Sequence, residues 1–324
     1  MKLFKSFASL VLLFAMFSSC STDVDIYADY EDITIVYGLM DTSSDTTFLK
    51  ITKAFLGPGN ALIIAHDPDS SNYYYKLNVT LTGIQNGVEK QNIIFDTITI
   101  DNKLEGDSIF YFPEQILYYA DEILNPDYRY TLNISKQDGD ISSETGVIED
   151  FTISKPNRFI NFMGDNDIEW KSAKEGKRYE TSIRFNYQEL LPGSTDTLNK
   201  YIEWYLGMRK SITTAGGEEM YIGYVGDVFY TTLENELDPI LNVQRWTGLV
   251  DVIVASASQE FDTYLEVNNG TNSIVSEVPI YTNINGGFGL FASRKTILKS
   301  VSVSVQSELK LITDYPDLGF KAKP

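Results

Sequence analysis

The chain has 324 residues, with 45 acidic side chains against 26 Lys and Arg, a single Cys and a single His. A formal net charge of −19 disfavours nucleic-acid binding, which depends on clustered Lys and Arg. One Cys and one His exclude an intramolecular disulfide and a zinc site that needs several such ligands. A chain of this length usually divides into two domains.

The first 19 residues predict a secretory signal peptide. Lys2 and Lys5 precede an apolar run at 7–17, which is shorter than the ~20 residues that a membrane-spanning helix needs. Two serines then precede Cys20, the order that lipoprotein signal peptidase requires. We therefore expect cleavage before Cys20 and lipidation of its thiol, so that acyl chains anchor the mature chain to a membrane.

Residues 20–32 form a short acidic tether after the lipidated cysteine. Some Gram-negative envelopes treat acidic residues at this place as an address for export to the cell surface. The tether is then either such an address or a solvated leader without one. Both the outer and the periplasmic face of the outer membrane stay open as the location.

Alternation of apolar and polar residues dominates the rest of the chain. Within 76–84, Leu77, Val79 and Leu81 alternate with polar residues, which places them on one face of a half-buried strand. Many short strands separated by Gly, Asn and Pro turns indicate antiparallel sandwiches. Further strands are expected at 32–39, 47–55, 92–100, 128–135, 143–149, 178–187, 200–209, 249–255 and 301–311.

Three segments predict helices, because their apolar residues recur at three- and four-residue spacing. The first, 113–124, begins with Pro113 in its first turn. The second is 227–237, which ends before a proline. The third, 256–267, opens with Ser256 and Gln259 at the spacing of a capping box.

The segment 124–130 (LNPDYRY) resembles the turn that enters the penultimate strand of fibronectin type III-like domains. In those domains a Tyr hydroxyl caps a backbone group at the corner of the sandwich. We therefore predict a mostly-β protein of two domains. An immunoglobulin- or fibronectin-like sandwich occupies 33–154, and a second β domain with two short helices occupies 155–324.

The chain offers no catalytic constellation that stands out, and we expect a protein that is not an enzyme and needs no cofactor. His66 lies in a polar segment that predicts an exposed loop, and no Gly-x-Ser-x-Gly motif occurs. Asp165, Asp167 and Glu169 alternate, but they lack the Gly and the distal Glu of an EF-hand. They are either ligands of a structural calcium ion or a solvated acidic turn.

Clustered aromatic residues raise the question of glycan binding, because exposed rings can stack on sugars. In the strand expected at 200–209, alternation points Ile202 and Trp204 inward and leaves Tyr201 and Tyr205 outward. Tyr201 and Tyr205 are therefore candidates for glycan stacking. The alternative is ordinary surface, since sandwiches use aromatic residues heavily.

The segment 276–291 (SEVPIYTNINGGFGLF) resembles a stretch of the Bacteroidota lipoproteins that are grouped as domain of unknown function 4249. The 124–149 region and the order of lipidation site, immunoglobulin-like domain and second β domain also fit. Members look like partners of TonB-dependent outer-membrane transporters, and the family has no established activity. The resemblance implies an outer-membrane accessory protein of such a transporter.

The glycine-rich part of this segment has two interpretations. It is either a loop that docks a partner or a tight connection into the last strands, in which glycines permit close backbone approach. The residues concerned are Asn283, Gly286, Gly287, Phe288 and Gly289.

The leading hypothesis from the sequence is a non-enzymatic accessory protein on a lipid anchor. The first alternative is an adhesin or a fimbrial-type subunit, which needs a basic cleavage site soon after the lipidated cysteine. The first basic residue after Lys5 is Lys50, inside an expected strand, which argues against this alternative. The second alternative is a surface protein that captures glycans directly.

Overall fold

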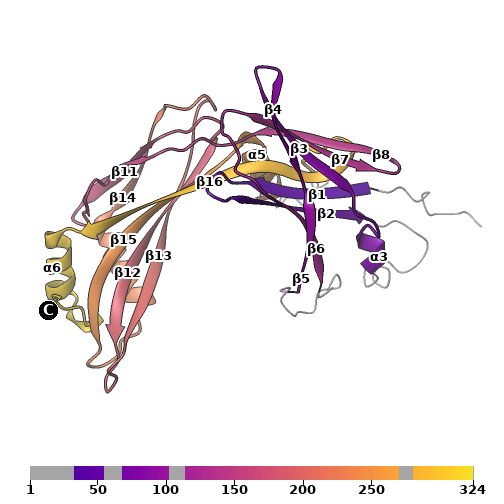
Figure 1. The fold of residues 1–324 in the computed structure, drawn as a ribbon. Coiled ribbons are helices and arrows are strands. Elements are labelled where there is room, and N and C mark those ends of the chain that lie inside the picture. Colours follow the sequence, from indigo (N-terminus) through magenta and orange to yellow (C-terminus); the bar gives the residue numbers. More distant parts are fainter. Residues whose placement is uncertain (1–32, 55–67, 102–113, 270–279, 324) are drawn as a thin grey trace, which may run out of the picture.

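The computed structural model describes residues 33–54, 68–101, 114–269 and 280–323, and it confirms a mostly-β protein. Within these ranges, sixteen strands form sheets of nine, four and three strands. Figure 1 shows an arch with two arms. The end of the nine-stranded sheet whose strands lie between residues 33 and 121 forms the first arm, and the end whose strands lie between residues 178 and 257 forms the second arm. The signal peptide, Cys20, the acidic tether and His66 lie outside the described residues.

The nine-stranded sheet runs through the whole molecule. Its strands pair antiparallel, apart from the parallel pairs that β16 makes with β1 and with the short β10. The path is β13 (Thr197–Lys210), β12 (Arg178–Leu190), β15 (Gln244–Ala257), β16 (Gly287–Val303), β1 (Ile33–Met40), β2 (Thr46–Ala54), β6 (Gln115–Asp121) and β5 (Asp96–Ile100), with β10 (Phe159–Ile160) beside β16.

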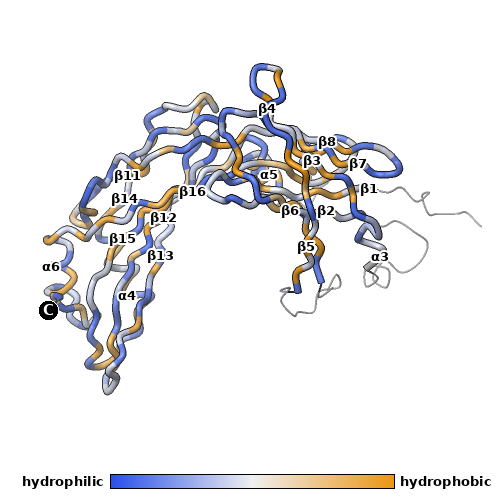
Figure 2. The backbone as a smooth tube through the Cα atoms, viewed as in Figure 1, coloured by the Kyte–Doolittle hydropathy of each residue, from blue (hydrophilic) through white to orange (hydrophobic). Residues whose placement is uncertain are grey.

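Two smaller sheets cover one face of the long sheet, one over each arm (Figure 1). Alternation of apolar and polar residues along strands such as β12 and β15 supplies the buried face (Figure 2). The four-stranded sheet has the order β4 (Val88–Ile94), β3 (Asn78–Gln85), β7 (Arg129–Lys136) and β8 (Gly139–Gly146), and the three-stranded sheet β14 (Glu219–Val225), β11 (Asp165–Lys171) and β9 (Ile153–Lys155).

Strand β16 contributes to both hydrophobic cores. Residues 287–293 pair with β1, and residues 294–302 pair with β15. Phe291 is accordingly buried in a first core with Leu81 and Tyr130, whereas Val301 is buried in a second core with Trp170. The division into domains at residue 154 stays a prediction, and the first core takes Phe291 from the region assigned to the second domain.

Two of the three expected helices are present. α4 (Gly226–Glu236) matches its prediction closely, and α5 (Gln259–Asn269) begins a few residues later than expected. Ser256 lies in β15, and the residue next to the helix is Ser258, whose carbonyl accepts from the Asp262 N–H. The prediction that Ser256 opens this helix with a capping box is therefore wrong, because the helix begins at Gln259. A four-residue helix, α3 (Pro68–Ser71), and a 3-10 turn, η1 (Pro316–Leu318), were not expected.

The helix expected at 113–124 is wrong where the structure describes it, because residues 115–121 form strand β6. Residues 116, 118 and 120 are apolar or aromatic and alternate, so the segment fits a strand period as well as a helical one. Tyr118 and Ala120 are buried on one face of β6, and β6 pairs with β2 and β5 on its two sides. Pairing with two neighbours thus overrides the local pattern.

The strand expected at 301–311 is also wrong beyond Val303, where the chain turns into helix α6 (Val305–Asp314). Ser304 caps the helix by accepting a hydrogen bond from the Ser307 N–H at 3.2 Å. Leu311 is buried, but Val305 is 72% exposed, so the two do not share one strand face. The strand expected at 92–100 is divided between β4 and β5, which belong to different sheets.

The corner expected at 124–130 is confirmed. The Asn125 N–H donates to the Tyr130 hydroxyl oxygen at 2.8 Å, and that hydroxyl donates to Gln91 Oε1 at 2.7 Å. Tyr130 is fully buried, so its hydroxyl fixes the turn from inside the first core. Of the helices in the described ranges, none has the length and apolar character to cross a membrane.

Candidate ligand-binding face

The outward face of β12 and β13 carries the aromatic residues that the sequence singled out. Tyr201 is 59% exposed and Tyr205 is 58% exposed, whereas Ile202 is buried and Trp204 packs against the second core. This confirms the expected inward and outward directions. Stacking of either ring on a glycan stays a prediction.

Tyr201 is contacted by Arg184 of the neighbouring strand β12, which is itself paired with Glu203 of β13. The Arg184 guanidinium carbon lies 4.8 Å from the centre of the Tyr201 ring. The same guanidinium donates to Glu203 Oε1, at 2.7 Å from Nη2 and 3.1 Å from Nε, and this bond raises the pKa of Arg184. The ion pair restricts Arg184, and the cation–π contact then favours one orientation of the Tyr201 ring on the sheet.

A hollow of about 380 Å³ opens beside Tyr201, and we call it the Tyr201 hollow. Gly248 forms part of its wall, where a Cβ atom would lie only 2.6 Å from the Asn186 carbonyl oxygen. The hollow is lined from three strands and from the C-terminal tail, mainly by Asn186, Gln188, Asn199, Tyr201, Gly248 and Lys323.

The amide of Asn186 is oriented by two hydrogen-bond acceptors. Its Nδ2 donates to the Leu249 carbonyl at 2.9 Å and to Asp251 Oδ2 at 2.8 Å. Asp251 also accepts from Ser300 Oγ at 2.5 Å. Two acceptors around Nδ2 identify it as the nitrogen and leave Oδ1 as a fixed acceptor.

A pair of hydrogen-bonded side-chain amides lies further along β12 and β13. Gln188 Nε2 donates to Asn199 Oδ1 at 3.3 Å. Sequence reasoning did not single out either residue, nor Asn186. Their outward parity on adjacent strands was readable, but their closeness to Tyr201 depends on the β12–β13 register, which pairs Tyr201 with Asn186 and Asn199 with Gln188.

A second hollow, of about 410 Å³, lies where β13 approaches β11 and β14. It brings Tyr205, a candidate for glycan stacking, together with Asp165 and Asp167, two candidate calcium ligands. Glu169 instead forms an ion pair with Lys155, in which its Oε1 lies 2.6 Å from Nζ. No group of three or more His, Cys, Asp or Glu residues in the described ranges is placed to hold a metal ion, and calcium at this position stays a prediction.

The glycine-rich segment has a clear packing role. Gly289 has a φ of +115°, and a Cβ there would lie 1.9 Å from the Val36 carbonyl oxygen. A Cβ on Gly287 would lie 2.6 Å from the Thr34 carbonyl oxygen. These two glycines let β16 lie beside β1, and the φ of +78° at Gly286 suits the turn before β16.

Asn283 also acts within the fold. Its Nδ2 donates to the Phe291 carbonyl at 2.6 Å, and its Oδ1 accepts from the Phe291 N–H at 3.0 Å. Phe288 is 42% exposed. Docking of a partner at this segment therefore stays a prediction that concerns mainly Phe288.

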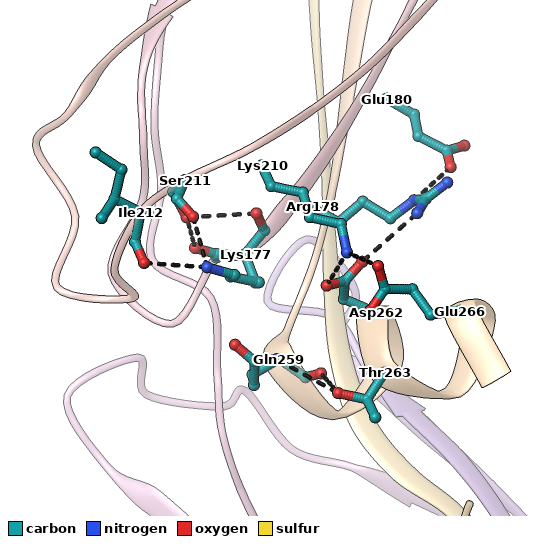
Figure 3. Close-up of polar contacts among 11 residues, drawn as sticks. Lys177, Arg178, Glu180, Lys210, Ser211, Ile212, Gln259, Asp262, Thr263 and Glu266 are labelled. Carbon is teal, nitrogen blue, oxygen red and sulfur yellow. Dashed lines mark hydrogen bonds and ion pairs between the residues drawn. The ribbon is translucent and has the colours of Figure 1, made fainter.

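A cluster of ion pairs fastens α5 to the ends of β12 and β13 (Figure 3). Asp262, whose side chain is 2% exposed, lies 2.7 Å from Lys210 Nζ and 3.5 Å from Arg178 Nη1. Lys210 also pairs with Glu266, and Arg178 lies 2.8 Å from Glu180. Each cation thus has two carboxylate partners, which indicates a structural cluster rather than an anion site.

Comparisons with known proteins assign no family. A scan against protein-family models finds no match, and neither does a search of curated protein sequences. Among solved structures, the C-terminal globular domain of an oligosaccharyltransferase from Pyrococcus abyssi is similar at 11% identity and a TM-score of 0.23. The match covers 69% of this chain and 47% of that one, so this chain spans about half of that structure. A TM-score this low carries no functional argument.

Proposed function

We propose that this chain is a lipid-anchored outer-membrane protein that binds rather than catalyses, and that it serves a TonB-dependent transporter as an accessory partner. The observation that carries the anchor is the N-terminal order of two lysines, an apolar run at 7–17, two serines and Cys20. Cys20 is the only cysteine in the chain, so its thiol has no competing disulfide partner. The transporter as partner follows from the resemblance of 276–291.

A binding role is supported by the chemistry of the β12–β13 face. Its central charged groups are Arg184 and Glu203, which pair with each other, and Asp251, which accepts from Asn186 and Ser300. Each of these charged groups already has a hydrogen-bond or ion-pair partner within the protein. An exposed aromatic ring beside hydrogen-bonded amides is suited to holding a ligand.

The test is affinity purification of the full-length lipoprotein from gently solubilised native membranes, with mass spectrometry of the recovered proteins. We expect one β-barrel transporter in a stoichiometric amount and incorporation of a labelled palmitate analogue. The variant Cys20→Ala is the matched control, and it should lose the label and the membrane fraction. Recovery of the wild type alone, with its label intact, would reject the transporter partner but keep the anchor.

The adhesin or fimbrial alternative receives a structural argument against it. Lys50 lies in β2 opposite Tyr37 of β1, inside the nine-stranded sheet. Cleavage at Lys50 would detach β1, which is the strand between β2 and β16. Regular ladders of this protein on undenatured gels would favour the alternative in spite of that cost.

A further inference from the structure

We infer that the Tyr201 hollow is a carbohydrate-binding site, which takes a neutral or acidic saccharide and does not take a cationic one. The inference rests on the proposed binding function, but it needs neither the anchor nor the transporter. Three independent features of the hollow point to this ligand class: the ring, the amides and the charge.

The ring supplies a flat apolar platform. The Arg184 guanidinium stacks at 4.8 Å from the ring centre, and 59% of Tyr201 remains exposed. Sugar rings present apolar C–H faces that pack against an aromatic face, whose electron density attracts them. Because the contact with Arg184 already favours one orientation of the ring, ordering the ring on binding costs less entropy.

The amides supply the polar contacts that hydroxyl groups need. Asn186 Oδ1, Gln188 Oε1 and Asn199 Nδ2 have no protein partner within the described ranges. Together they offer two acceptors and one donor beside the ring. Each sugar hydroxyl both donates and accepts, so neighbouring hydroxyls can satisfy such a set, whereas an apolar ligand would leave it unpaired.

The charge of the hollow decides which saccharides fit. No lining residue in the described ranges is acidic, and Lys323 adds a positive charge at the rim. The other lining cation, Lys200, is bound to Glu189 at 2.5 Å. Neutral and uronic-acid sugars are therefore compatible with the hollow.

The experiment measures saccharide binding by the purified full-length chain in detergent, by isothermal titration calorimetry. The probes are cellohexaose, maltohexaose, mannohexaose, xylohexaose, a galacturonate oligomer and a chitosan oligomer. Tyr201→Ala is compared with Tyr205→Ala, which removes a ring of nearly equal exposure from the same strand. Tyr201→Phe keeps the platform and serves as the conservative variant.

We expect at least one neutral or acidic probe to bind and the chitosan oligomer not to bind. Tyr201→Ala should weaken binding about tenfold or more, while Tyr205→Ala and Tyr201→Phe change it little. Loss in Tyr205→Ala alone, equal loss in both alanine variants, or no binding of any probe would each overturn the inference. Recovery of a transporter together with no saccharide binding would overturn this inference alone, and the reverse result would overturn only the transporter proposal.

Discussion

Glu189 is a buried carboxylate that joins three parts of the second arm. Its side chain is 1% exposed and lies 2.7 Å from Arg245, which is equally buried, and 2.5 Å from Lys200. Arg245 also donates to the carbonyls of Leu318 at 2.8 Å and Asp238 at 3.1 Å. The pair therefore fastens the C-terminal tail and the segment after α4 to β12 and β15.

We expect Glu189→Gln to lower the free energy of unfolding by about 3 kcal/mol, because it leaves the buried Arg245 charge unpaired. Glu203→Gln is the matched control, since it breaks the exposed pair with Arg184 and should cost less than about 1 kcal/mol. Urea unfolding followed by tryptophan fluorescence measures both. Equal losses in the two variants would contradict the structural role of the buried pair.

The same variant should change the response to acid. Burial raises the pKa of Glu189, but hydrogen bonds from Lys200 and Arg245 outweigh it and hold the pKa below the ordinary 4.5. The folded state then binds this proton more weakly than the unfolded state does. Its stabilisation is complete above the ordinary pKa and is lost as the pH falls through the lowered value. Stability below pH 4.5 should therefore fall more steeply in the wild type than in Glu189→Gln.

Local contacts and contacts between distant residues differ in how well the sequence predicts them. Tyr130 was predictable, because its partner Asn125 lies five residues away within one recurring turn. Glu189 was not, since Arg245 is 56 residues distant and many other cations have the same charge. The outward direction of Tyr201 followed from alternation, whereas Asn186 and Gln188 joined the site only through strand register.

At the scale of elements, β16 depends on a glycine. Gly289→Ala should lower the free energy of unfolding by about 3 kcal/mol or more, because its φ is +115° and its Cβ would meet the Val36 carbonyl oxygen at 1.9 Å. Gly217→Ala is the control for φ alone, with a φ of +85° and no atom within 4 Å of a Cβ, and should cost about 1 kcal/mol. Thermal unfolding compares the two. A loss in Gly289→Ala no larger than in the control would argue against close approach of β1.

The central strands were easy to predict from the sequence. The ends of the elements, and the choice between strand and helix in ambiguous segments, were harder to predict. Central strands such as β3 and β12 alternate strictly, and one face of each is buried. Residues 115–121 and 305–311 fit both the strand period and the helix period. Contacts with other parts of the chain decided between the two. β6 has strand partners on both sides, whereas the described residues 305–311 follow a helix cap and pair with no strand.

At the scale of the whole molecule, the two arms share one strand. A fragment of residues 33–154 would lack β16, and with it the parallel partner of β1 and the buried Phe291. We expect this fragment to show little protection of its amide hydrogens from exchange when expressed alone. Addition of a peptide covering 280–296 should restore protection in β1, and a peptide with Gly289→Ala should not. A fragment that is well protected by itself would establish the division at 154 as a true domain boundary.

The parallel pairing of β1 with β16 also sets the order of events in time. A chain is synthesised from its N-terminus, so β1 is made about 250 residues before the strand that completes its sheet. Until β16 arrives, one edge of β1 presents free backbone groups to any other strand nearby. The first core therefore stays unfinished until residues 287–293 of β16 have been made.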